Sequence, residues 1–154
     1  MTDAVHPVAI DAAEIAAVVR TFFAAFTSGP GCAERLDALP ALFLPAAVIV
    51  RTCGGEPMSY DVPGFVAPRR ELLTGGAITD FSEWELEGRT EVFGDIAQHW
   101  CSYAKQWRQD GEERSGRGMK CFLFVRTPEG WRIAGAAWDD ERDGLSLDQA
   151  RLRS

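Results

Sequence analysis

The sequence has few of the side chains that bind metals or activate nucleophiles. It contains two histidines, His6 and His99, and four cysteines, with no CxxC spacing among them. Zinc motifs place three or four such ligands at short, regular intervals. A glycine-rich phosphate loop and a GxSxG segment are also missing. The sequence therefore predicts no metal site, no bound cofactor and no serine-hydrolase nucleophile.

Basic clusters and long apolar runs are missing too. The net charge is −7, and no basic run exceeds Pro-Arg-Arg at 68–70. Nucleic acids and anionic membrane surfaces require a basic face, so neither is expected as a partner. The most apolar stretch, 15–26, is interrupted by Arg20 and falls short of the roughly 20 apolar residues that span a bilayer. Without features of a secretion signal, the cysteines are expected to be free thiols in the cytoplasm.

The first half of the chain has a helical pattern. Its 154 residues suit a single domain. Residues 10–27 repeat apolar side chains at helical spacing, as do residues 33–44, although Pro40 interrupts the second segment. A strand is predicted over 46–52. A third helix is predicted over 61–76, with Asp61 as its N-cap.

From residue 79 onward the apolar period changes from helical to alternating. Strands are predicted over 79–93, 96–109, 114–126 and 131–139, joined by short turns. Helices followed by an antiparallel sheet indicate an α+β fold, with the helices covering one face of the sheet. We assign residues 1–9 to a disordered N-terminus, 10–142 to the domain and 143–154 to a C-terminal tail.

The turns predict which side chains share a face of this sheet. A two-residue loop at Gly94-Asp95 places Thr90 opposite His99, and a similar loop at 110–111 places His99 opposite Phe122. Continued without a bulge, the ladders gather one set of side chains on the face beneath the helices. The set is Trp84, Leu86, Thr90, His99, Cys101, Tyr103, Lys120, Phe122 and Asp139.

Three residues of this face are candidates for catalysis. His99 could act as a general base, or it could be held by a hydrogen bond to Thr90 or Tyr103. Asp139 could act as a base, or it could pair with Lys120. Tyr103 could stabilise an oxyanion together with Lys120, or close the rim of the core. Arginines of the 68–70 segment could face an anionic ligand at the pocket mouth, or lie on a solvated helix face.

The opposite face of the last three strands is also apolar. It is predicted to carry Trp100, Met119, Leu123 and Trp138. This is more apolar surface than a soluble monomer usually exposes. A homodimer formed through this face is therefore expected.

Three segments resemble the nuclear transport factor 2-like superfamily, which includes SnoaL-like and ketosteroid isomerase-like proteins. They are LDALPALFLPAAVIV at 36–50, FGDIAQHWCSY at 93–103 and RTPEGWRIAGAAWDDE at 126–141. The resemblance implies a cone-shaped, cystatin-like fold with three N-terminal helices on the concave face of a curved, mainly antiparallel sheet. It also implies a pocket, which in different members serves as an isomerase, dehydratase or cyclase site or has no known chemistry.

Two classes of function follow. The first is a cofactor-free acid–base enzyme acting on a small apolar carbonyl compound, which the polar residues of the inner face favour. The second is a non-catalytic module that binds a hydrophobic ligand or dimerises. Ala46 favours the second class, because many superfamily members have an acidic residue at this position. One fold hosts many functions, so the resemblance leaves the choice open.

Overall fold

The computed structural model describes residues 7–148. His6, in the predicted disordered N-terminus, and residues 149–154 of the predicted tail lie outside the described residues. The helical part of the chain comprises α1 (Val8–Ala25), α2 (Cys32–Ala38), the short 3-10 helix η1 (Leu39–Leu42) and α3 (Val62–Thr74). All three predicted helices are present. Residues 8 and 9 belong to α1, so the prediction that they are disordered is wrong.

Local sequence explains two of the helix boundaries. Pro40 cannot donate a backbone hydrogen bond, and the segment predicted as one helix over 33–44 changes at Leu39 from α-helix to a 3-10 turn. Asp61 caps α3, because its Oδ1 accepts a 2.8 Å hydrogen bond from the backbone N–H of Gly64.

Six strands form one sheet in the order β2-β1-β6-β5-β4-β3. They are β1 (Phe43–Arg51), β2 (Met58–Tyr60), β3 (Thr79–Phe93), β4 (Ile96–Gln109), β5 (Glu112–Thr127) and β6 (Gly130–Asp140). All neighbouring pairs are antiparallel except β1 and β6. The strand β2 has only three residues and was not predicted.

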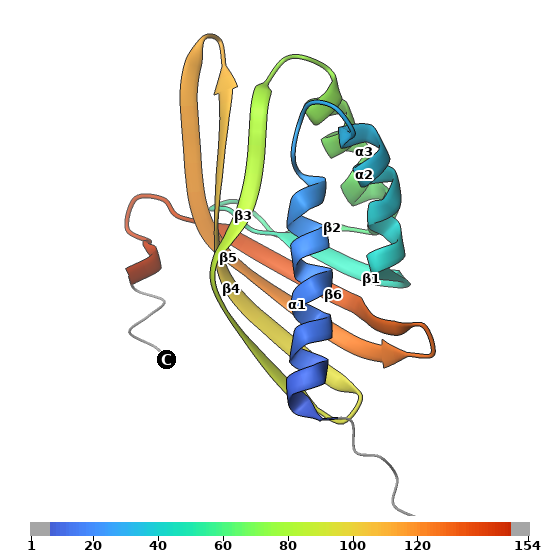
Figure 1. Cartoon of the computed structure of the whole chain (residues 1–154). Helices are drawn as coiled ribbons and strands as arrows, with labels where there is room; N and C mark the ends of the chain where they lie inside the picture. Colours follow the sequence, from blue (N-terminus) through green and yellow to red (C-terminus); the bar gives the residue numbers. More distant parts are fainter. Residues whose placement is uncertain (1–6, 149–154) are drawn as a thin grey trace, which may run out of the picture.

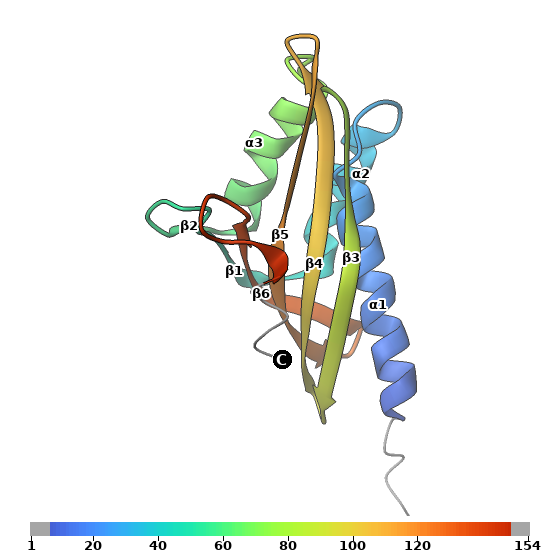
Figure 2. The same cartoon turned by 90° about the vertical axis from the view of Figure 1, so that its left-hand side faces the viewer.

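The helices lie on the concave side of this sheet. Figure 1 shows α1 crossing the sheet, with α2 and α3 at one end near β1 and β2, and Figure 2 shows the long strands curving along their length. Aromatic side chains of α1 fill the space between the layers, for example Phe22, whose ring centroid is 5.0 Å from that of Phe122. The architecture is the expected α+β arrangement. Among the described residues, no helix combines the length and apolar character needed to cross a bilayer.

The predicted pairing is correct near the turns and wrong beyond two bulges. Thr90 lies opposite His99, and His99 opposite Phe122, as expected. Between Glu85 and Glu87 the β3–β4 register shifts, so that Glu85 rather than Leu86 lies opposite Tyr103. A bulge inserts one residue into one strand and thereby exchanges the two faces beyond it.

A second shift, between Leu123 and Phe124, changes the pairing of β5 with β6. Gly118 therefore lies opposite Asp140, where an uninterrupted ladder would place Asp139. Lys120 likewise lies opposite Trp138, and Trp138 points toward the helices and is buried. The prediction that Trp138 belongs to the outer, dimer-forming face is wrong for this reason.

Candidate functional site

A pocket of about 360 Å³ lies between α3 and the inner face of the sheet. A volume of this size can hold a small organic molecule. Side chains from the end of α1, from α3 and from all six strands reach it. Six aromatic side chains line it, namely Phe26, Tyr60, Phe65, Phe81, Tyr103 and Trp138.

The pocket wall contains a buried pair of opposite charges. Lys120 of β5 and Glu83 of β3 both line it, and Lys120 Nζ lies 3.8 Å from Glu83 Oε2. The ammonium also lies 4.1 Å from the ring centroid of Tyr103 and 4.7 Å from that of Trp138. Burial lowers the pKa of Lys120, and the charge of Glu83 acts in the opposite direction. The aromatic rings and Glu83 both favour the ammonium form.

A second polar group lies at the end of β6, beside the pocket. The hydroxyl of Tyr103 donates to Asp140 Oδ1, and Lys105 Nζ donates to Oδ2 at 3.1 Å. Burial acts to raise the pKa of Asp140. The hydrogen bond from Tyr103 and the charge of Lys105 outweigh it, so the pKa lies below the usual value. Burial and Asp140 raise the pKa of Tyr103, which therefore remains a protonated donor.

Gly118 leaves the room that this contact needs. It lies opposite both Tyr103 and Asp140 in the two ladders. A Cβ atom at position 118 would lie 2.6 Å from Asp140 Oδ1 and would also meet the backbone oxygen of Asp139. A glycine at this position thus lets Asp140 approach the neighbouring strands closely.

Arg69 of α3 is held against the aromatic wall. Its guanidinium carbon lies 4.1 Å from the ring centroid of Phe65 and 5.2 Å from that of Trp138. One nitrogen, Nη1, donates to the carbonyl oxygen of Phe65 at 2.9 Å. Burial lowers the pKa of Arg69. The neighbouring Arg70 is placed differently, because it pairs with Asp37 of α2.

The pocket has more cations than acids around it. Lys105 and Lys120 each have an acidic partner, Asp140 and Glu83 respectively. Arg51 and Arg69 also line the pocket, and within residues 7–148 no ion pair joins either of them to a carboxylate. In a chain with a net charge of −7, this local excess of positive charge is suited to an anionic ligand.

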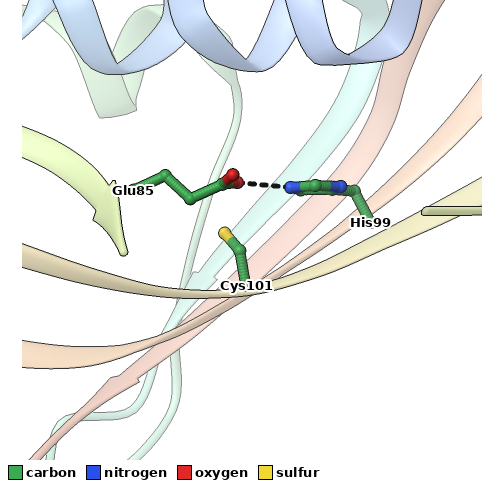
Figure 3. Close-up of side chains that lie close together, drawn as sticks. All are labelled: Glu85, His99 and Cys101. Atoms are coloured by element: carbon green, nitrogen blue, oxygen red, sulfur yellow. Dashed lines mark hydrogen bonds and ion pairs between the residues drawn. The ribbon is translucent and has the colours of Figure 1, made fainter. Parts of the chain in front are cut away.

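His99 belongs to a separate cluster, shown in Figure 3. Its Nδ1 lies 2.7 Å from Thr90 Oγ1, and its Nε2 lies 2.5 Å from Glu85 Oε1. The sulfur of Cys101 belongs to the same cluster and lies within 4.8 Å of the Glu85 and His99 ligand atoms. The hydrogen bond with His99 lowers the pKa of Glu85, and burial raises that of Cys101. A buried, protonated thiol is a poor nucleophile.

Six of the nine predicted inner-face residues lie beneath the helices, and three do not. Tyr103 and Lys120 line the pocket, whereas His99 and its neighbours lie beside it. Trp84 and Leu86 are displaced to the outer face by the bulge in β3 and are exposed. Asp139 Oδ1 accepts a hydrogen bond from Arg142 rather than facing Tyr103. The six on the inner face are Thr90, His99, Cys101, Tyr103, Lys120 and Phe122.

Six charged residues of these sites, Arg51 and Lys105 among them, were not predicted as site members. Ladders without a bulge place Glu83 and Glu85 on the face opposite to that of Trp84 and Leu86, and Asp139 rather than its neighbour Asp140 was assigned to the inner face. The run Trp84-Glu85-Leu86-Glu87 contains no glycine or proline that would reveal the bulge. Arg69 belongs to the 68–70 segment, for which an anion-facing role was one of two alternatives.

No family model matches the chain, and no curated protein sequence matches it. The chain does, however, resemble solved structures. An NTF2-like protein with a cystatin-like fold from Novosphingobium aromaticivorans is 20% identical over 94% of this chain and 90% of its own, with a TM-score of 0.69. A candidate dehydratase of the NTF2-like family from Streptomyces avermitilis is 16% identical over 88% and 99%, with a TM-score of 0.67.

An NTF2-like protein of unknown function from Silicibacter pomeroyi is 20% identical over 88% of this chain and 99% of its own, with a TM-score of 0.61. At these identities the likeness concerns the fold and not the reaction. Together with the curved sheet and its helical cover, it shows that the chain has the cystatin-like α+β fold of the NTF2-like proteins.

Proposed function

We propose that this protein binds a small, partly apolar carbonyl compound in the pocket and transfers protons at the carbon next to the carbonyl group. The observation that carries the proposal is the Glu83–Lys120 pair, which is buried in an aromatic wall and faces the cavity. A carboxylate and an ammonium group side by side supply a base and a stabiliser of negative charge.

The two side chains have distinct roles in this proposal. Glu83 removes a proton from the carbon, and the electrons of the broken C–H bond move onto the carbonyl oxygen to give an enolate. Lys120 donates a hydrogen bond to that oxygen. Return of the proton at another position gives an isomerase. A dehydratase results when the enolate electrons re-form the carbonyl group and expel a hydroxyl group from the adjacent carbon, which leaves as water with the proton held by Glu83. Tyr103 shapes the wall, because its hydroxyl is already donated to Asp140.

Arg69 and Arg51, which line the pocket, favour a substrate that also carries an acidic group. Arg69 is stacked on aromatic rings and has no acidic partner among the described residues, so a ligand carboxylate would supply its counter-ion. An aromatic or alicyclic keto acid combines the three features that the pocket would recognise: a ring, a carbonyl group and an anion.

Deuterium exchange into two simple carbonyl compounds tests the proposal. Phenylpyruvate has the three features, and phenylacetone lacks the carboxylate. In D₂O, proton NMR should show that the protein accelerates loss of the signal from the hydrogens next to the carbonyl of phenylpyruvate. Glu83→Gln should slow this exchange by about 100-fold or more. Glu91→Gln, which alters an exposed carboxylate of the same strand, is the matched control.

The two arginines of α3 provide a test of anion recognition. Arg69→Gln should weaken phenylpyruvate binding by about 10-fold or more and leave phenylacetone binding unchanged. Arg70→Gln removes the neighbouring guanidinium, which pairs with Asp37, and should affect neither. If Arg69→Gln weakened the binding of both compounds equally, the arginine would be shown to support the pocket wall rather than to recognise the anion.

A non-catalytic binding function is the second candidate. The observation in its favour is that Glu83 and Asp140 already have cationic partners within the protein. In that case both compounds should bind, and no exchange above the uncatalysed rate should be seen. This outcome would overturn the catalytic proposal.

A further inference from the structure

The cluster beside the pocket brings together three different metal-binding groups. One carboxylate oxygen of Glu85, one ring nitrogen of His99 and the sulfur of Cys101 all lie within 4.8 Å of one another. His99 and Cys101 are buried, and Figure 3 shows the three side chains converging from two strands. We propose that Glu85, His99 and Cys101 bind a divalent transition-metal ion, with Zn²⁺ the best match.

The donor set selects the class of ion. Nitrogen, sulfur and one oxygen donor suit zinc and its neighbours among the later transition metals. Calcium and magnesium require several oxygen donors, and the cluster offers one carboxylate. Three protein ligands leave a fourth position, which a water molecule would complete.

A change of about 1 Å brings the Glu85 and His99 ligand atoms to the separation that they would have around a zinc ion. Zinc bonds to imidazole nitrogen and carboxylate oxygen are about 2.0–2.2 Å, which separates two such atoms by about 3.3 Å in a tetrahedral shell. Glu85 Oε1 and His99 Nε2 now lie 2.5 Å apart. Glu85 has a flexible side chain that is 34% exposed, so its carboxylate can move away from His99 by the difference between these two distances.

The surroundings of His99 fix its orientation. Thr90 Oγ1 lies 2.7 Å from Nδ1, so it can accept a hydrogen bond from Nδ1–H and leave the Nε2 lone pair for an ion. Metal-binding histidines usually have such a partner. Gly88 keeps this side open, because a Cβ there would lie 2.7 Å from His99 Nε2 and 2.8 Å from Glu85 Oε1.

The charges of the occupied site balance. A divalent ion, one carboxylate, one thiolate and a neutral imidazole sum to zero, which suits a buried position. Binding forms a metal–sulfur bond, and the thiol proton of Cys101 is released to solvent. Lys120 lies directly opposite Cys101 in the β4–β5 ladder, so a cationic side chain neighbours the thiol on the inner face. Glu85 and His99 do not line the pocket, so the inference is independent of the proposed function.

Cobalt(II) titration of the reduced, chelator-treated protein tests this site. Cobalt(II) should bind at one equivalent and give the near-ultraviolet sulfur-to-metal charge-transfer band of a thiolate ligand. Zinc should displace it and should raise the melting temperature of the protein. Cys101→Ser should abolish the band. Cys121→Ser is the matched control, because it removes a thiol from the other face of the adjacent strand, and it should keep the band.

Two further variants keep the test decisive if Cys101→Ser fails to fold. Glu85→Gln changes a partly exposed side chain and should weaken cobalt binding by about 10-fold or more. Thr90→Ala removes the hydrogen-bond partner of His99 and should weaken cobalt binding by about 10-fold. The assignment would be overturned if the wild-type protein gave no charge-transfer band. It would also be overturned if the band persisted in Cys101→Ser, or if it shifted or disappeared in Cys121→Ser. Unchanged affinity in Glu85→Gln would overturn it as well.

Discussion

The hydroxyl of Tyr103 on β4 donates a hydrogen bond to the carboxylate of Asp140 on β6, across the intervening strand β5. The contact spans two ladders because Gly118, the residue between them, has no side chain. Lys105 completes the group on the other carboxylate oxygen. The hydrogen bond holds Tyr103, which lines the pocket, to a carboxylate that does not line it. The end of β6 therefore helps to set the shape of the cavity.

Removing the hydroxyl should destabilise the fold without changing the volume of the core. Tyr103→Phe leaves the buried side of Asp140 without a donor, and we expect a loss of about 1–3 kcal/mol in the free energy of unfolding. Urea denaturation measures this loss. Tyr60→Phe is the control, since among the described residues the hydroxyl of Tyr60 hydrogen-bonds only the sulfur of Met58, at 3.7 Å. The resulting change in the free energy of unfolding should stay within about 0.5 kcal/mol.

The pH dependence of stability should report the charge of Asp140. The folded-state pKa of this group is below its ordinary value, so the unfolded chain takes up its proton first as the pH falls. The stabilisation is complete above the ordinary value of about 3.9 and is lost as the pH drops through the folded-state pKa.

Asp140→Asn should therefore be less stable than wild type at pH 7, and the difference should shrink below about pH 4. Chemical denaturation at a series of pH values measures it. Glu56→Gln, which alters an exposed carboxylate in the β1–β2 turn, serves as the control. A difference between Asp140→Asn and wild type that stays constant down to the acid transition would contradict this pKa direction.

Much of the fold could be predicted because helix and strand periods, caps and turns are local properties. The bounds predicted for β3 and β4 are those observed, and the pairing next to each turn is correct. Turn geometry fixes the register of the first pairs of a hairpin and has no influence beyond a bulge. His99 and Thr90, which lie close to the turn, were therefore placed correctly.

The candidate site was harder to predict, because it depends on residues beyond the bulges. Glu83 and Glu85 alternate with Trp84 and Leu86, so either set could face the helices by composition alone. The register shift between Glu85 and Glu87 decides between them, and it turns the two carboxylates inward, to Lys120 and His99. The second shift, between Leu123 and Phe124, turns Trp138 inward and Asp139 outward.

Gly118 should tolerate no side chain. Gly118→Ala would place a methyl group against Asp140 and the backbone of β6, and backbone cannot move aside as a side-chain end can. We expect a loss of about 1–3 kcal/mol or more in the free energy of unfolding. Gly55→Ala is the control, because the added Cβ would meet only the backbone oxygen of Thr52, at 3.9 Å. Equal stability of the two variants would show that β5 and β6 can separate at this point.

The outer face of the sheet is expected to form a homodimer. Trp100 of β4 and Leu123 of β5 are 44% and 50% exposed on it, and the bulge in β3 adds Trp84 and Leu86 to the same face. Met119 lies on this face as well, whereas Trp138 does not. A patch of this kind can be covered by its own copy across a two-fold axis, which repeats the same contacts twice.

Leu123→Glu should break this dimer, because a two-fold axis places the new charge in the interface twice. We expect wild type to sediment as a dimer at micromolar concentration, and the variant to dissociate at least about 100-fold more readily, which is on the order of 3 kcal/mol. Val8→Glu places the same charge at an exposed position of α1 and should leave the dimer intact. Sedimentation of the wild type as a monomer would contradict the expectation and would mean that a soluble chain leaves Trp100 and Leu123 in contact with water.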